Sequence, residues 1–412
     1  MTATLTNQDR IERMRLAMER EKLDALVLRL PENVLLLSGY WPMLGICQLV
    51  FPREGRASVL IPDYYHEEAG PNLWEAEPRY YRFGVLGAPD PVEVTRAFLA
   101  DAARGKGWKR VGYEGSFSLI APAWQAAETL VPNETTRPFY QAAMGDVELI
   151  DAAALLQSER RCKTAFEIGK LTTAAEISCF GLELFQEMAG IGVSGVELAA
   201  AVEAAVMSRG IGYNGAQRVR AWAQVAGGPA ETAMGFRMNE ISTTRRLQNG
   251  DAALLELAVV ADGFWADRTR VRVAGSPTDE QVRVFETLVR AQENAISAIL
   301  PGVTGAMVDE AARSVLRDAG LEPHFPHITG HGLGFGYHES LPKMAPGSTD
   351  VLEEGMLTSV EPGVYYRPVG GFRVEDNVLV TRDGHQVLGE FPKALNSSAS
   401  EPVVPAAARS RW

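Results

Sequence analysis

Residues 254–269, LLELAVVADGFWADRT, decide the fold of the second half of the chain. Two apolar runs flank Asp262-Gly263, and this dipeptide is a strong signal for a two-residue hairpin turn. Pairing about the turn places Asp267 opposite Ala258, because both positions are equally far from the turn centre. Glu256 lies two residues from Ala258 and therefore shares a sheet face with Asp267, one diagonal step away.

Two carboxylates on one sheet face amid Leu, Ala and Val are costly unless a positive group lies between them. A metal ion would supply that group. The alternative is that Glu256 occupies the exposed side of a half-buried hairpin. Glu361 in SVEPGVYY and Glu375 in FRVEDNV repeat the pattern, since each is a single acid within an apolar strand segment. For each of these two acids alone, a surface strand is an alternative explanation.

Histidines are concentrated beside these acids. Four of the six histidines of the chain are His324, His327, His331 and His338. A glycine on each side of His331 allows its backbone to approach another group closely. Imidazoles in tight glycine-rich loops are common metal ligands, although a solvated loop is the alternative. Oxygen-rich sites with one imidazole suit manganese, iron, cobalt or zinc, so the residues predict a dinuclear hydrolase.

Size and composition limit the class of protein. A chain of 412 residues suggests two domains, and its net charge of −12 argues against a nucleic-acid or anionic-membrane partner. Three widely spaced cysteines fit a reducing compartment and give no CxxC metal signature. The charged N-terminus lacks the apolar core of a secretion signal, and no apolar run approaches the roughly 20 residues that span a bilayer. We predict a soluble, cytoplasmic protein.

Secondary-structure signals divide the chain in the same way. Alternating strand and helix patterns over residues 1–155 predict an α/β domain, in which PENVLLLSGY reads as a turn followed by an apolar segment. Residues 156–395 combine strong helical patterns with hairpins and predict a second α/β (α+β) domain. Residues 396–412 are rich in Ser, Ala and Pro, and we predict that they form a disordered tail.

These motifs resemble the creatinase/prolidase/aminopeptidase P group, the pita-bread metallopeptidase family. The similarity runs from about residue 10 to about residue 392. RIERMRLAMEREKLDALVLRLPENVLLLSGY is similar to the opening of the creatinase-type N-terminal domain, and ERRCKTAFEIGKL is similar to the entry into the catalytic domain. The resemblance implies a creatinase-type N-terminal domain over residues 1–155 and a pita-bread catalytic domain over residues 156–395.

The family's ligand order is Asp, Asp, His, Glu, Glu, with the first two eleven residues apart, as Glu256 and Asp267 are here. The resemblance extends to His331 in TGHGLG, Glu361 in VEPGVY and Glu375 in GFRVED. It implies two divalent metal ions (Mn, Co, Zn or Fe), bridged by Asp267 and Glu375. Glu256 would bind one ion, and His331 with Glu361 would bind the other.

Further residues match positions that contact substrate in the family. His327, four residues before His331, and His338, seven residues after it, match the two outer histidines of the family. Tyr365 and Arg373 lie where proline-specific members carry Tyr and Arg. Structural roles are the alternative for both, and Arg373 could pair with a neighbouring carboxylate.

The sequence departs from the family at two positions. Glu256 replaces the first aspartate, and its additional methylene moves the carboxylate by about 1 Å. Asn239 stands 17 residues before Glu256, where the peptidases carry a histidine. Asparagine can bind an oxyanion but cannot shuttle a proton at neutral pH.

The leading hypothesis is hydrolysis of an amide-type C–N bond, in a Xaa-Pro peptide, a dipeptide or a small peptide-like compound, by a metal-bridging hydroxide. His338 with Asn239 would stabilise the oxyanion, and Glu361 would relay the water proton. His327, Tyr365 and Arg373 would position the polar end of the substrate.

Two other hypotheses remain open. The second hypothesis, favoured by Asn239 and Glu256, is a non-peptidase enzyme on the same scaffold, similar to ectoine hydrolase or dimethylsulfoniopropionate lyase. The third hypothesis is a catalytically silent binding module. The resemblance also implies a homodimer in which Tyr40 and Trp41 are lid or pocket candidates, with core packing as their alternative role.

Overall fold

The computed structural model describes residues 7–67, 73–74, 76–116, 135–235 and 242–395. Asn239 and the tail over residues 396–412 lie outside the described residues. The chain divides between Glu167 and Ile168 into two compact units. The junction expected at residue 155 falls within helix α6 (Ala153–Arg161), and the division between the units falls in the first turn of α7 (Ala165–Met188).

The N-terminal unit contains a six-stranded mixed sheet in the order β4-β3-β2-β1-β5-β6. Its strands are β1 (Ala25–Leu28), β2 (Gln48–Pro52), β3 (Ala57–Pro62), β4 (Ala76–Tyr81), β5 (Arg110–Tyr113) and β6 (Glu148–Asp151). The described helices are α1 (Gln8–Arg20), α2 (Pro31–Ser38), α4 (Pro91–Ala103), α5 (Thr136–Met144) and α6. Strand β1 is fully buried at the centre, where it pairs parallel with β5 and antiparallel with β2. Helices and mixed strands therefore form the expected α/β unit.

The segment PENVLLLSGY forms helix α2, whereas its residue pattern had indicated a turn and an apolar segment. Pro31 occupies the first turn, and Gly39 ends the helix with φ of 77°. These are the preferred residues for a helix start and a helix stop, and they outweigh the ambiguous apolar run between them. Tyr40 and Trp41, which follow α2, are only 1% and 5% exposed, which favours core packing over a lid.

The C-terminal unit contains three sheets. The first sheet is ordered β7-β8-β9 and consists of β7 (Val219–Gly227), β8 (Ala252–Ala261) and β9 (Phe264–Val273). The second sheet is ordered β11-β10-β12-β15-β16 and consists of β10 (Gly330–Gly332), β11 (Glu339–Met344), β12 (Leu357–Val360), β15 (Asp376–Thr381) and β16 (Gly384–Leu388). The third sheet pairs β13 (Gly363–Tyr366) with β14 (Gly370–Arg373).

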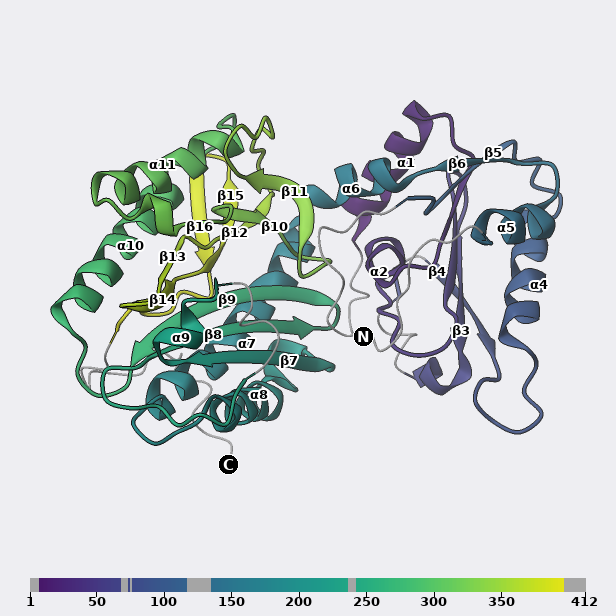
Figure 1. The fold of residues 1–412 in the computed structure, drawn as a ribbon. Helices are drawn as coiled ribbons and strands as arrows, with labels where there is room; N and C mark the ends of the chain where they lie inside the picture. The colour runs from purple at the N-terminus through teal and green to yellow at the C-terminus, as the bar shows by residue number, and fades with distance from the viewer. Residues whose placement is uncertain (1–6, 68–72, 75, 117–134, 236–241, 396–412) are drawn as a thin grey trace. The chain divides into compact units, whose positions relative to one another are not determined.

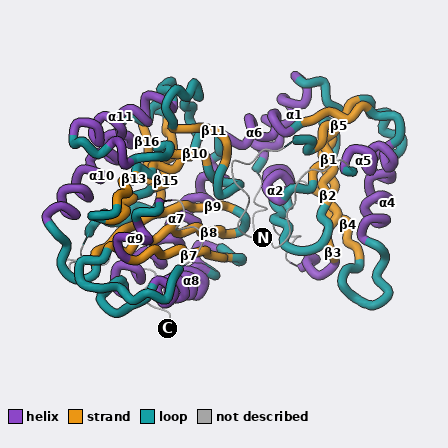
Figure 2. The backbone as a smooth tube through the Cα atoms, in the orientation of Figure 1, coloured by secondary structure: helices purple, strands orange, loops and turns teal. Residues whose placement is uncertain are grey.

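Helices flank these sheets on two sides. The described helices are α7, α8 (Gly195–Gly210), α9 (Gly228–Thr232), α10 (Asp279–Ser297) and α11 (Gly305–Asp318). Figure 1 shows α7 and α8 beside β7–β9, and α10 and α11 beside the strands that follow them. Figure 2 shows the strands as an inner layer between these helices. No helix in the described ranges is both long and apolar enough to span a bilayer.

The hairpin expected from residues 254–269 is confirmed in its register. Strands β8 and β9 pair antiparallel, and Ala258 is the partner of Asp267. Asp262 and Gly263 form the turn with φ of 50° and 91°, the left-handed conformation that a two-residue turn of this kind requires. Every residue of β8 is buried, and Glu256 is 6% exposed. The exposed-hairpin explanation of Glu256 is therefore wrong.

Candidate metal centre

The β8–β9 hairpin supplies two of the acids. Glu256 is the register partner of Thr269, whose hydroxyl lies 2.6 Å from Glu256 Oε2 and 2.7 Å from Glu375 Oε2. Asn377 in β15 contacts the backbone of Asp267 twice, as acceptor from its N–H at 3.1 Å and as donor to its carbonyl at 2.6 Å. The hairpin is thus fixed against the five-stranded sheet, with its acids facing that sheet.

Glu361 and Glu375 lie where the chain crosses between sheets, and not within the strands as the sequence suggested. Strand β12 ends at Val360 and β14 ends at Arg373, one residue and two residues before these acids. Val360 pairs with Asp376, and Gly363 pairs with Arg373, so the two crossing points face each other. Pro362 cannot donate to a ladder, which ends the pairing at Glu361.

His331 reaches the same acids from the short strand β10, whereas the sequence had indicated a glycine-rich loop. A Cβ at Gly330 would collide with the Ser359 carbonyl, and one at Gly332 would collide with the Leu341 carbonyl, which confirms the expected close backbone approach. His331 Nδ1 lies 2.9 Å from the Gly332 carbonyl, to which it donates, and Nε2 faces the acids.

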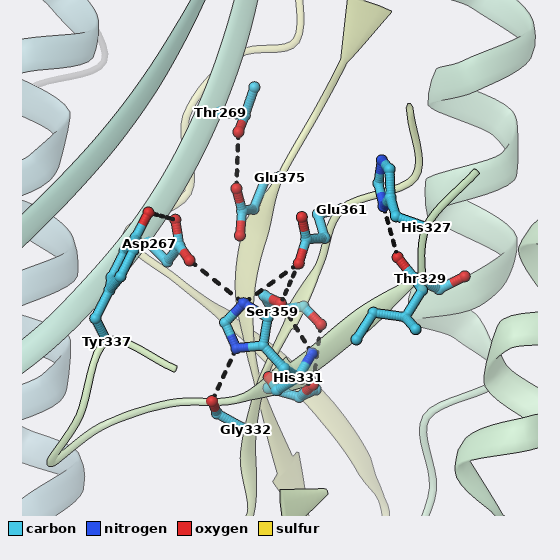
Figure 3. Close-up of polar contacts among 12 residues, drawn as sticks. Asp267, Thr269, His327, Thr329, His331, Gly332, Tyr337, Ser359, Glu361 and Glu375 are labelled. Carbon is cyan, nitrogen blue, oxygen red and sulfur yellow. Dashed lines mark hydrogen bonds and ion pairs between the residues drawn. The ribbon is translucent and has the colours of Figure 1, made fainter. Parts of the chain in front are cut away.

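Figure 3 shows how His331 converges with Asp267, Glu361 and Glu375. His331 Nε2 lies 3.5 Å from Asp267 Oδ2 and 3.3 Å from Glu361 Oε1. Three overlapping groups have all ligand atoms within 4.8 Å of one another: Asp267, His331 and His338; His331, Glu361 and Glu375; Glu256, Asp267 and Glu375. The five expected ligands are at most 7% exposed. The structure therefore brings together all five.

The donor set fits divalent metal ions. Among the described residues, His338 Nδ1 and Glu375 Oε1 are buried atoms without a hydrogen-bond partner, and His331 Nε2 has only its ion-pair contacts with Asp267 and Glu361. Buried polar atoms in native proteins are nearly always paired, and a metal ion is one of the partners that explains an exception. Four carboxylates and an imidazole around one space suit manganese, iron, cobalt or zinc.

Electrostatics favour the same conclusion. Burial, and then repulsion from Glu256, raise the pKa of Asp267 to about 8. Burial and the charge of Asp267 likewise raise the pKa of Glu375 well above the usual carboxyl range. His331 lowers the pKa of Glu361 to about 2, although burial alone would raise it. Asp267 and Glu361 in turn raise the pKa of His331 to about 10, although burial alone would lower it. The metal-free site therefore retains protons that metal ions would displace.

The metal-free protein should lose stability as the pH rises from about 6 to about 8. Across this range Asp267 and Glu375 keep protons in the folded chain that the unfolded chain has lost, and His331 does so above the ordinary imidazole pKa of 6.5. The free energy of unfolding then falls by about 1.4 kcal/mol per pH unit for each such group. Saturating Mn²⁺ should abolish this fall. Thermal unfolding with and without Mn²⁺ tests the expectation, and a metal-free midpoint that rises across this range contradicts it.

A second chain of polar contacts adjoins the ligands. His327 Nδ1 lies 2.8 Å from the Ile328 carbonyl, and its Nε2 lies 3.0 Å from the Tyr365 hydroxyl. Arg373 Nη1 donates to the same hydroxyl at 2.9 Å. Burial lowers the pKa of His327 to about 4, so the imidazole is neutral and accepts from Tyr365. These three predicted residues form one network.

Arg373 also pairs with the first ligand, which is the alternative role that its sequence position left open. Its Nη2 forms a short ion pair with Glu256, and its Nε donates to the Thr269 hydroxyl at 2.9 Å. Burial alone would raise the pKa of Glu256, but Arg373 holds it below the usual carboxyl range. Glu256 is consequently ionised in the metal-free protein, unlike Asp267.

His338 lies beside the ligand histidine, with its ring 4.4 Å from that of His331. Burial, and then the charge of His331, lower the pKa of His338 to about 4, so it is neutral at pH 7. His324 is not part of the site, because its ring stacks on Tyr366 at 4.5 Å.

Sequence reasoning missed Thr269 and Tyr337. The Tyr337 hydroxyl donates to Glu256 Oε1 at 2.5 Å and lies 3.1 Å from Asp267 Oδ1. Thr269 could have been found from the hairpin register, which places it opposite Glu256. Tyr337 is next to His338 in a loop without a pairing register, so no sequence signal indicated its direction.

Comparisons with known proteins agree with this geometry. Residues 169–382 match the model of metallopeptidase family M24, and residues 10–162 match the creatinase/prolidase N-terminal domain. The YkvY protein of Bacillus subtilis is 31% identical over 78% of this chain and 90% of that protein. The Xaa-Pro dipeptidase of Pyrococcus furiosus is 26% identical over 94% of this chain and 99% of that protein. A solved Xaa-Pro dipeptidase from Bacillus anthracis has a TM-score of 0.76 at 26% identity, covering 94% of this chain and 99% of that chain.

Fold and site together define a metal-dependent hydrolase with a creatinase-type N-terminal domain and a pita-bread catalytic domain. The match over residues 169–382, more than half of the chain, with a relative above 30% identity, identifies the family. The chain belongs to metallopeptidase family M24.

Proposed function

We propose that the protein hydrolyses the Xaa-Pro bond of dipeptides or short peptides, using two divalent metal ions. The observation that carries the proposal is the convergence of Glu256, Asp267, His331, Glu361 and Glu375 in one buried space, with unpaired ligand atoms directed into it. Similarity to proteins named Xaa-Pro dipeptidase over nearly their whole length supports this choice of substrate.

The five ligands would hold the ions, with Asp267 and Glu375 shared between the two positions. When bound, such ions lower the pKa of a water molecule and polarise a carbonyl group. Manganese, cobalt, zinc and iron all fit the donor set, and we propose manganese as the first metal to test.

Glu361 is the acid that we assign to proton transfer from the attacking water. In the metal-free protein His331 lowers the pKa of Glu361 to about 2, although burial opposes it, so the carboxylate is ionised at neutral pH. The Ser359 hydroxyl donates to Glu361 Oε1 at 3.1 Å and so orients the carboxylate. Neutral His338, with its unpaired Nδ1, is the group that we assign to stabilising the oxyanion of the carbonyl. We also propose that Asn239 shares this role of stabilising the oxyanion with His338.

His327 and Tyr365 would contact the polar end of the substrate. Arg373 already contacts Glu256, Thr269 and Tyr365, and we assign it to holding these groups in place. The proposed peptide site would then depend on Arg373 through its neighbours.

The proposal predicts metal-dependent cleavage of Xaa-Pro dipeptides. The protein is stripped with a chelator, reloaded with Mn²⁺, Co²⁺ or Zn²⁺, and assayed on Gly-Pro, Ala-Pro and Leu-Pro, with Ala-Ala and longer Xaa-Pro peptides for comparison. We expect two metal ions per chain and hydrolysis restricted to proline peptides. His331→Ala, prepared identically, controls for contaminating peptidases. A protein that binds no metal and remains inert after reconstitution refutes the proposal.

A second candidate is a non-peptidase reaction on a small molecule, either hydrolysis of a C–N bond or lyase-type cleavage of a sulfonium acid. The ion pair between Glu256 and Arg373 favours it, because Glu256, the residue that departs from the family's aspartate, has its charge balanced by Arg373. Cyclic amides, amidines and sulfonium acids join the same assay panel. Stoichiometric metal with turnover of one of these compounds, and none of any proline peptide, would favour this candidate.

We also propose that the protein acts in the cytoplasm as a homodimer. The few cysteines support the first suggestion, and the resemblance supports the second. Sedimentation of the purified protein tests the oligomeric state.

A further inference from the structure

We propose that Tyr337 is a positioning residue that fixes the long carboxylate of Glu256 for metal binding. The inference rests on the proposed metal site, but it concerns a residue outside the five ligands. Tyr337 lies between β10 and β11, in the loop that also carries His338 and that follows His331 of β10. Its hydroxyl is the group that joins this loop to the hairpin acids.

The contacts of Glu256 divide between its two oxygens. Oε2 accepts from Thr269 and from Arg373, both of which come from strands of the sheets. Oε1 accepts from the Tyr337 hydroxyl at 2.5 Å. The same hydroxyl oxygen lies 3.1 Å from Asp267 Oδ1. Tyr337 therefore sets the direction of the oxygen that faces the second hairpin acid.

Packing fixes the Tyr337 ring. It contacts the Trp265 ring with centroids 5.8 Å apart and the His338 ring with centroids 4.2 Å apart. Trp265 in turn stacks on Trp222 at 5.5 Å with planes 23° apart. Tyr337 is only 4% exposed. An aromatic side chain packed between other rings places its hydroxyl more firmly than a flexible polar chain would.

Glu256 needs such a partner because of its length. Glutamate has one more rotatable side-chain bond than aspartate, so its carboxylate samples more positions unless other groups restrain it. Metal affinity depends on the orientation of ligands by surrounding hydrogen bonds, and loss of one such bond typically weakens binding by roughly 10–100-fold. Tyr337 supplies the bond on the oxygen that Thr269 and Arg373 do not reach.

The test is Mn²⁺ titration of the metal-free full-length chain by calorimetry. Tyr337→Phe removes the hydroxyl and keeps the ring. We expect the metal position served by Glu256 to weaken by roughly 10–100-fold, while the other position changes by less than about twofold. Tyr140→Phe is the matched control, because Tyr140 is also buried and its hydroxyl donates to Gln48 in the N-terminal unit.

A double-mutant cycle separates positioning from a general structural effect. Glu256→Asp shortens the carboxylate and withdraws it from Tyr337, so restoring the family's residue should weaken the same metal position. In that background Tyr337→Phe should change the affinity by less than about threefold. If Tyr337→Phe does not fold, Glu256→Asp alone still decides, since unchanged or tighter binding overturns the inference.

The outcomes distinguish this inference from the proposed function. Two metal ions bound equally well by wild type and Tyr337→Phe overturn the role of Tyr337 and leave the proposed hydrolase intact. An equal loss in both backgrounds overturns it as well. A wild-type chain that binds no Mn²⁺, Co²⁺ or Zn²⁺ overturns both proposals.

Discussion

Glu375→Gln should nearly abolish hydrolysis and at the same time make the metal-free protein more stable. Glutamine keeps the shape of the side chain and its contact with Thr269 but removes the charge that would be shared by two metal ions. Metal ions contribute several kcal/mol of transition-state stabilisation, so kcat/KM should fall by at least about a thousandfold.

The gain in stability follows from the raised pKa of Glu375. Burial and the charge of Asp267 make the carboxyl take up a proton on folding at pH 7, which an amide does not need to do. Removing this cost should stabilise the metal-free chain by up to about 3 kcal/mol at pH 7. Calorimetry of the chelator-treated protein measures the gain, and metal analysis measures the loss of bound ions. A variant that keeps both metals and full activity contradicts the assignment of Glu375 as a ligand.

How far the sequence predicts such a site is clear from the hairpin. Asp262-Gly263 specifies a two-residue turn, a turn specifies the register, and a register with period two decides which side chains share a face. The relative positions of Glu256 and Asp267 therefore follow from local sequence alone. His331 was identifiable for a similar reason, because the two flanking glycines indicated the close approach that the carbonyls of Ser359 and Leu341 now explain.

Other features depend on contacts between segments that are distant in sequence. Glu361 and Glu375 face each other because the chain crosses twice between two sheets, and a local pattern carries no information about such a crossing. The partners of Arg373 and Tyr337 are separated from them by 117 and 81 residues, so their choice of Glu256 follows from tertiary packing alone. The helix α2 was missed because its apolar run is too short to show a helical period.

Asp376→Asn, one residue beyond Glu375, should have the opposite effect on stability. Asp376 Oδ1 accepts from Arg268 Nη2 at 2.9 Å and from Arg270 Nη2 at 2.7 Å, and both arginines are at most 1% exposed. Removing the carboxylate leaves two buried guanidinium groups without their counter-charge. Breaking a buried ion pair in this way typically costs about 3–5 kcal/mol, so the free energy of unfolding should fall by about that amount.

Metal binding should survive this change, because the ligand cluster does not include Asp376. Arg270 Nη1 still donates to the Glu375 carbonyl at 2.7 Å, and this contact holds the ligand's backbone in place. The Asp376→Asn protein should therefore bind Mn²⁺ with wild-type stoichiometry at a temperature below its lowered unfolding midpoint. Loss of metal from the folded variant would mean that Asp376 belongs to the site. Glu375→Gln and Asp376→Asn should therefore change the free energy of unfolding in opposite directions. Neighbouring carboxylates repel Glu375, whereas two arginines balance the charge of Asp376. Burial of a carboxylate is favourable only when its charge is balanced in this way.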